Sequence, residues 1–190
     1  EYGRLWNNDI TGNVTIADHV SYAGAFNTAI RNNIITGNST FSNNGSNNFL
    51  EGDVAATGNV YNGNVTFNAA GGPVYISYLD ALQCSGNLTV SRTVTGVTSM
   101  FNASGTVAGN FSYSNNTGGA TGIGNINFKT SIGGTINITA NYTTPDVFIM
   151  YRLINQTSGG NINVQNSVGF NLQKDTLKVT SLSIIGYRTG

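Results

Sequence analysis

The sequence predicts an all-β protein, more narrowly an antiparallel β-sandwich of the immunoglobulin-like or jelly-roll type. Three observations lead to this prediction. A five-residue unit recurs along the chain: Gly-Asn, any residue, then Thr, Ser or Asn, then a large apolar residue. Within each unit, polar and apolar residues alternate as they do in a strand with one buried face. Turn residues separate about twelve such strands at intervals of about 8–12 residues, which is typical of sandwiches and barrels.

The repeated unit combines a turn with a strand. Close copies begin at Gly12, Gly37, Gly86, Gly109, Gly124 and Gly160, and the stretch that they repeat is residues 57–68, counted from Gly58. The Gly-Asn pair tolerates positive φ and suits a turn or bulge. Within residues 57–68, Asn62-Gly63 lies between two strand-like runs, which predicts a type I′ hairpin. Copies about 25 residues apart also suggest a parallel β-helix. The spacings vary from 15 to 36 residues, however, and a hairpin requires antiparallel strands, so the sandwich is preferred.

The same patterns place the individual elements. Strands are expected at residues 10–16, 34–41, 54–67, 74–79, 87–101, 106–113, 125–129, 135–142, 147–154, 168–172 and 176–187. Loops or turns are expected at residues 42–48, 114–124 and 155–160, and helical turns are considered at residues 23–33 and 80–85. The apolar residues change parity near Ser181, which predicts a bulge or a switch of the buried face there. We divide the chain into an N-terminal extension, residues 1–20, and a sandwich domain, residues 21–190.

The composition excludes several classes of partner. Charged residues make up 8% of the chain, against about a quarter in typical domains. The net charge is zero, and nucleic-acid binding requires clustered Lys and Arg. No apolar run approaches the ~20 residues that cross a bilayer. We therefore expect neither a nucleic-acid partner nor a membrane span in the mature chain.

Glycosylation would supply the hydration that charges do not. The chain holds eleven Asn-x-Ser/Thr sequons, about twice the number that chance placement of its 29 Asn and 39 Ser plus Thr would give. They are Asn13, Asn38, Asn44, Asn64, Asn87, Asn102, Asn110, Asn115, Asn137, Asn141 and Asn155. Such sequons predict covalent N-glycans, hence an extracellular protein. The chain begins at Glu1 without Met, as expected after removal of a signal peptide.

Catalytic and metal sites find little support, and we expect no enzyme and no cofactor apart from glycans. His19 is the only histidine, and its neighbour Asp18 is poorly placed to orient it in a triad. One cysteine, Cys84, allows no intrachain disulfide and suits a small core residue. A glycosidase pair would have to come from Glu51, Asp53, Asp80 and Asp146. Sugar-binding aromatics (Trp6, Tyr61, Tyr142) and an isopeptide bond from Lys129, Lys174 or Lys178 are the remaining alternatives.

The segment Ile10-Thr-Gly-Asn-Val-Thr-Ile16 resembles the N-terminal donor strand of chaperone–usher pilins, which has alternating apolar residues and one fixed glycine. The residues that correspond are Ile10, Gly12, Val14 and Ile16. As a whole, the chain resembles subunits of the archaeal thread filament, with archaeal bundling pilins as a second similar group. This resemblance implies a glycosylated cell-surface filament for adhesion or biofilm formation, in which copies join head-to-tail by donor-strand complementation. The alternative is a monomeric surface adhesin, a sugar-binding module or an S-layer-associated protein.

Overall fold

The fold is a stack of parallel coils. The computed structural model describes residues 3–19, 27–52, 58–72, 74–76, 81–93, 99–100, 105–115, 125–126, 130–140, 147–151, 153–165, 169–173 and 176–185. These residues form 22 strands and no helix. All their strand pairs are parallel. The chain is therefore a β-solenoid, and the antiparallel sandwich expected from the sequence is wrong.

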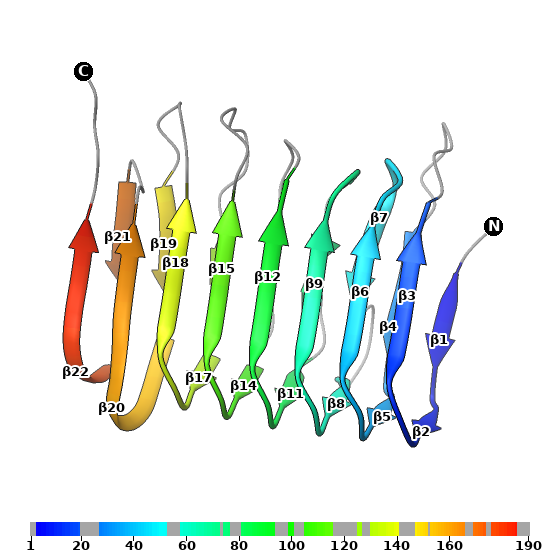
Figure 1. Cartoon of the computed structure of the whole chain (residues 1–190), viewed down its shortest axis with the longest axis horizontal. Coiled ribbons are helices and arrows are strands. Elements are labelled where there is room, and N and C mark those ends of the chain that lie inside the picture. Colours follow the sequence, from blue (N-terminus) through cyan, green and yellow to red (C-terminus); the bar gives the residue numbers. More distant parts are fainter. Residues whose placement is uncertain are drawn as a thin grey trace.

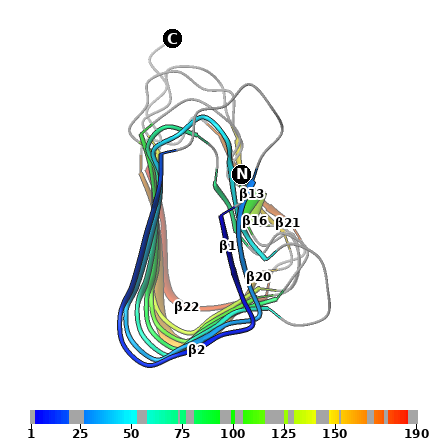
Figure 2. The same cartoon turned by 90° about the vertical axis from the view of Figure 1, so that its right-hand side faces the viewer.

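Each coil contributes strands to three faces, and the coils superimpose when viewed along the stack (Figure 2). The first face holds β1 (Arg4–Trp6), β4 (Asn27–Arg31), β7 (Asn48–Glu51), β10 (Val74–Tyr75), β13 (Ser99–Met100), β16 (Asn125–Ile126), β19 (Val147–Tyr151) and β21 (Gly169–Gln173). The short second face holds β2 (Asp9–Ile10), β5 (Ile34–Ile35), β8 (Val60–Tyr61), β11 (Leu82–Cys84), β14 (Gly105–Val107) and β17 (Thr130–Ile132).

The third face is the longest and most regular. It holds β3 (Val14–Asp18), β6 (Ser39–Asn43), β9 (Val65–Ala69), β12 (Leu88–Arg92), β15 (Phe111–Asn115) and β18 (Ile136–Ala140). Two long strands, β20 (Leu153–Gln165) and β22 (Thr176–Ile185), run through both the second and third faces. Figure 1 shows the third-face strands side by side, with their arrowheads pointing the same way.

The register of the third face shows the true repeat. One inward rank runs through Val14, Ser39, Val65, Leu88, Phe111, Ile136 and Ile162. Successive members are separated by 25, 26, 23, 23, 25 and 26 residues. The repeat is thus nearly constant. The irregular spacing that argued against a solenoid arises from counting Gly58 and Gly124 in place of Gly63 and Gly134, which lie two residues before β9 and β18.

The expected hairpin at Asn62-Gly63 is instead a corner between two faces. A type I′ turn needs positive φ at both central residues, but positive φ in the described residues occurs at Asn7, Asn32, Gly12 and Gly52. Glycine is required at position 63 for another reason. A Cβ there would lie 2.5 Å from the carbonyl oxygen of Gly37 on the preceding coil. The glycine therefore permits close stacking of coils.

The core fills the space between the three faces. Alternate residues of each third-face strand point inward, and Phe41, Val65, Phe67, Leu88 and Val90 have no exposed surface. Stacked coils bring like side chains together: the rings of Phe41 and Phe67 stack with centroids 5.2 Å apart. Each such ring buries a large apolar area, so the repetition of the sequence also builds the core.

Several local expectations change with the fold. Residues 23–33 and 80–85 contain strands β4 and β11, and residues 155–160, expected as a turn, lie within β20. The loop expected at residues 42–48 is confirmed for residues 44–47, which lie between β6 and β7. The bulge expected near Ser181 is also confirmed, because the β20–β22 register shifts between Gly160↔Val179 and Asn161↔Ser181. The expected loop at residues 114–124 falls mostly outside the described residues.

Candidate functional site

A ladder of asparagine side chains follows the corner between the second and third faces. Its members are Asn13, Asn38, Asn64, Asn87 and Asn110. The side-chain oxygen Oδ1 of each accepts a hydrogen bond of 2.8–2.9 Å from the backbone nitrogen of the corresponding residue one coil further on, ending at Thr135. These bonds satisfy backbone donors where the chain turns and strand pairing stops.

The ladder explains part of the sequon excess. Each ladder asparagine occupies the corner, and two residues later the strand presents an outward residue, which is Thr or Ser. In Asn64-Val65-Thr66, for example, Val65 is fully buried while Thr66 is partly exposed. Five of the eleven sequons therefore arise from the geometry of the coil. We did not find the ladder from the sequence. A signal for it exists, because the glycines at the corners recur every 23–26 residues when Gly63 and Gly134 are counted in place of Gly58 and Gly124.

The other sequons have varied positions. Asn44 is exposed in the loop after β6. Asn115 ends β15, Asn137 lies in β18 and Asn155 lies in β20. Asn102 and Asn141 fall outside the described residues.

The four residues expected to form a donor strand belong to the first coil of their own chain. Ile10 pairs with Ile35, Val14 pairs with Ser39 and Ile16 pairs with Phe41, all in parallel. Gly12 has φ of +118° at the corner between β2 and β3. The strands of the described residues all pair in parallel within the solenoid, so these residues form no incomplete sandwich of the pilin type that could receive a donor strand. The expected extension, residues 1–20, thus contributes β1, β2 and β3.

The outward side of the third face is polar and uncharged. One outward rank consists of Thr15, Thr40, Thr66, Thr89, Ser112 and Asn137. The next consists of Ala17, Ser42, Asn68, Ser91, Ser114 and Thr139. Contacts along a rank include a 3.2 Å hydrogen bond from Asn68 Nδ2 to Ser42 Oγ. The hydroxyl and amide groups of each rank repeat about every 4.8 Å. They can form hydrogen bonds with another polar surface, and they carry no charge that would attract it from a distance.

A buried polar network occupies the interior near the second face. Glu51 and Asn59 are fully buried. Asn59 Nδ2 donates to Glu51 Oε1 at 2.8 Å, and the Tyr61 hydroxyl donates to the same oxygen at 3.4 Å. Asn59 Oδ1 in turn accepts from Asn33 Nδ2 at 2.9 Å. Burial, and secondarily Glu51, raises the pKa of Tyr61 well above its usual value. This network satisfies buried groups and is closed to substrate.

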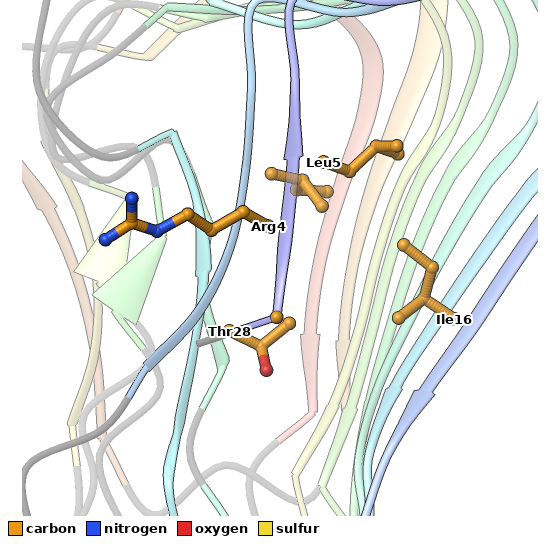
Figure 3. A pocket seen from close by; sticks show the side chains of 6 residues that line it. Arg4, Leu5, Ile16 and Thr28 are labelled. Carbon is orange, nitrogen blue, oxygen red and sulfur yellow. The ribbon is translucent and has the colours of Figure 1, made fainter. Parts of the chain in front are cut away.

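The first coil leaves an apolar cavity of about 250 Å³. It is lined by Gly3, Arg4, Leu5, Ile16, Thr28 and Ile30. Figure 3 shows Leu5 and Ile16 projecting into the space between β1 and β3, whereas Arg4 points away from it. Leu5, Ile10, Val14 and Ile16 pack against the core but are only partly buried. The cavity is the open end of the core.

The candidate catalytic residues that the structure describes are His19, Asp18 and Glu51. His19 is exposed at the end of β3, and Asp18 is buried and accepts a hydrogen bond from the hydroxyl of Thr28. Of the four carboxylates considered for a glycosidase pair, Glu51 is sealed in the core, while Asp53, Asp80 and Asp146 lie outside the described residues. Within the described ranges, no group of three His, Cys, Asp or Glu is close enough to hold a metal.

Cys84 and two of the aromatic residues considered for sugar binding, Trp6 and Tyr61, make contacts within the fold. Cys84 is buried, and burial raises its pKa to about 11. Trp6 lies beneath two guanidinium groups, with Arg31 Cζ 3.7 Å and Arg4 Cζ 4.5 Å from its ring centroid. Tyr61, one of the aromatic residues considered for sugar binding, is fully buried. Tyr142, Lys129 and Lys174 lie outside the described residues, and Lys178 lies in β22.

The class of protein is defined by the fold: an all-parallel β-solenoid with an asparagine corner ladder. No family model, no curated protein and no solved structure matches this chain. No helix in the described part of the chain is long and apolar enough to cross a membrane.

Proposed function

We propose that this chain is a non-catalytic structural subunit of an extracellular, glycosylated cell-surface filament, in which copies stack coil on coil. The observation that supports the proposal is the constant parallel register of the third face from β3 to β22. Because all strands of this face run in one direction and in one register, a second copy could add its first coil to the last coil by the same parallel pairing. Such a head-to-tail contact does not close on itself, so it propagates as a fibre.

The two ends of the stack present matching side chains. At one end, Val14 and Ile16 are partly exposed members of the inward ranks. At the other end, Leu182 occupies the rank of Val14 and is 46% exposed. Placing Val14 of one copy on Leu182 of the next buries both and adds hydrogen bonds between the open strand edges. With eight coils per copy, the fibre would repeat every ~38 Å.

Two substitutions on neighbouring residues test this contact. Ile16→Lys places a charge in the inward rank of the first coil and should abolish fibres seen by negative-stain microscopy. Thr15→Lys, on the outward side of the same strand, should leave them intact. Fibres that survive Ile16→Lys would contradict the stacking contact.

A cross-link gives a measurement that does not depend on the stability of the first coil. Thr15 and Ser183 occupy the same outward rank at opposite ends. In the proposed fibre they become neighbours at about 4.8 Å, within the Cα range of a disulfide. The double variant Thr15→Cys/Ser183→Cys should form a ladder of covalent oligomers on oxidation, and Thr15→Cys alone should not. A chain that stays monomeric throughout would rule out the filament.

A monomeric adhesin is the second candidate function, and the uncharged outward face of hydroxyl and amide side chains favours it. If this face binds a glycan or another polar surface, Thr66→Arg should abolish that binding and leave fibre formation unchanged. Binding by a chain that forms no fibres, lost on Thr66→Arg, would favour the adhesin.

A further inference from the structure

We propose that Asn44 accepts an N-linked glycan in the folded chain, and that the ladder asparagines Asn38, Asn64, Asn87 and Asn110 do not. This inference rests on the proposed extracellular function, because glycan transfer accompanies export. The donor would be an oligosaccharide linked to a polyprenyl pyrophosphate. A bond forms between Asn44 Nδ2 and the anomeric carbon, the bond from that carbon to the pyrophosphate oxygen breaks, and the lipid pyrophosphate leaves. The displaced amide proton passes to a base on the transferase.

Access to the whole sequon is the first difference between the two kinds of site. A transferase must hold the asparagine together with the hydroxyl residue two positions later, so the middle residue must leave any sheet it belongs to. The ladder sequon at Asn13 has a partly buried middle residue, Val14, in the end coil. In the other four the middle residue is a buried inward strand position: Val65, Leu88 and Phe111 have no exposed surface and Ser39 has 1%. Pulling out Val65 would disrupt β9 between its two neighbours, β6 and β12. The folded solenoid therefore closes these sequons.

The Asn44 sequon has no such barrier. Its middle residue, Gly45, is itself buried but has no side chain and belongs to no strand, and both Asn44 and Ser46 are exposed. The segment lies between β6 and β7, outside any strand. The backbone nitrogens of Asn44 and Gly45 both donate to the carbonyl oxygen of Asp18, at 2.6 and 3.0 Å. These bonds hold the corner in place while the two side chains remain in solvent.

The neighbouring coils give a second difference. Ladder asparagines follow one another at about 4.8 Å, and their amides are in direct contact: Asn87 Nδ2 lies 3.1 Å from Asn64 Oδ1. Oligosaccharides on adjacent rungs would overlap. At the Asn44 corner, the preceding and following coils present His19 and Ala70, which are exposed and belong to no sequon. A glycan at Asn44 thus has room on both sides.

Glycosylation of the folded chain in vitro tests the proposal. The purified 190-residue protein is incubated with a purified single-subunit oligosaccharyltransferase and a lipid-linked oligosaccharide, and the sites are read by glycopeptide mass spectrometry. We expect glycan at Asn44 and none at Asn64 or Asn87. Ser46→Ala, which keeps the asparagine but removes its sequon, should abolish modification at Asn44. Thr66→Ala, the matched change at a ladder sequon, should leave the glycan pattern unchanged.

Synthetic peptides separate folding from sequence preference. Peptides covering Asn44 and Asn64 should both be accepted, because the restriction comes from the fold. An unmodified Asn44 in the folded chain, or equal modification of Asn44 and Asn64, would overturn the proposal. Neither result bears on the filament, since fibres are scored by microscopy on unglycosylated protein, so the two proposals can fail separately.

Discussion

Asn64 Oδ1 lies 2.9 Å from the backbone nitrogen of Asn87, one coil further along the stack. The same bond recurs from Asn13 to Thr135. At each corner the chain leaves one face for the next, and a side-chain oxygen replaces the backbone acceptor that strand pairing would otherwise provide. The most abundant polar residue of this chain therefore holds successive coils in register.

Removing one ladder asparagine should destabilise the protein measurably. Asn64→Ala deprives the Asn87 nitrogen of its acceptor, and we expect a loss of about 1 kcal/mol in the free energy of unfolding. Asn64→Asp retains an acceptor oxygen and should be less destabilising. Urea unfolding followed by circular dichroism measures both. The control is Asn62→Ala, an exposed residue outside the ladder, which should stay within about 0.5 kcal/mol of the wild type. Equal losses for Asn62→Ala and Asn64→Ala would contradict the role of the ladder.

Gly63→Ala should disturb the coil before it. The new Cβ would lie 2.5 Å from the oxygen of Gly37, and overpacking of this kind costs about 1–3 kcal/mol. Amide hydrogen exchange should therefore accelerate around Gly37 as well as at the site itself. Gly12→Ala is the contrasting variant. Its Cβ would meet no atom within 4 Å, so its cost comes from the positive φ of +118° and should remain local. If Gly63→Ala accelerated amide hydrogen exchange only at residue 63 and not around Gly37, the result would argue against close stacking of the two coils.

Phe67→Ala should be among the most damaging single changes. The ring is fully buried and stacks on Phe41, and truncation of a core phenylalanine costs about 3–5 kcal/mol. Thermal unfolding should show a large drop in Tm. Thr66→Ala, one residue earlier on the outward side, should change Tm little. A small effect of Phe67→Ala would mean that the core is not packed as described.

Alkaline pH should destabilise the fold. Burial raises the pKa of Cys84 from 9.0 to about 11, and it also raises the pKa of Tyr61. In the unfolded chain these groups lose their protons at lower pH, so above pH ~9 the unfolded state binds fewer protons than the folded state. The free energy of unfolding should then fall as pH rises from 9 to 11. In Cys84→Ser the fall between pH 9 and 11 should be shallower. A slope identical to that of the wild type would contradict the burial of the thiol.

Strand content was largely predictable from the sequence, and strand pairing was not. Alternation in residues 10–16 shows that one side is buried, but parallel and antiparallel strands both have this property. Asn62-Gly63 favours an antiparallel hairpin, which is wrong, because glycine can serve either a tight turn or a close approach between coils. The sequence pattern does not distinguish these two uses. Only the register from Ser39 to Val65 to Leu88 shows which one applies.

The candidate sites illustrate the same limit. The sequence shows the sequons directly. It does not show why they are so numerous, because the asparagine ladder that accounts for five of them depends on the stacking of residues about 25 positions apart. Tyr61 and Glu51 looked available for sugar binding or catalysis, yet both are buried in one network. Burial of polar residues cannot be inferred from residue type. The apolar character of Ile10, Val14 and Ile16 was recognised correctly, while the strands they pair with were not.

The stacking of coils also determines how the molecule responds to tension. The strands β1 and β22 lie at opposite ends of the stack (Figure 1), and each described strand is bonded to strands of the adjacent coils. A pull on the two ends would peel off one coil at a time. Each coil of about 25 residues would release roughly 80 Å of chain. The protein would thus extend in steps and absorb mechanical work over a long distance, without a single abrupt rupture.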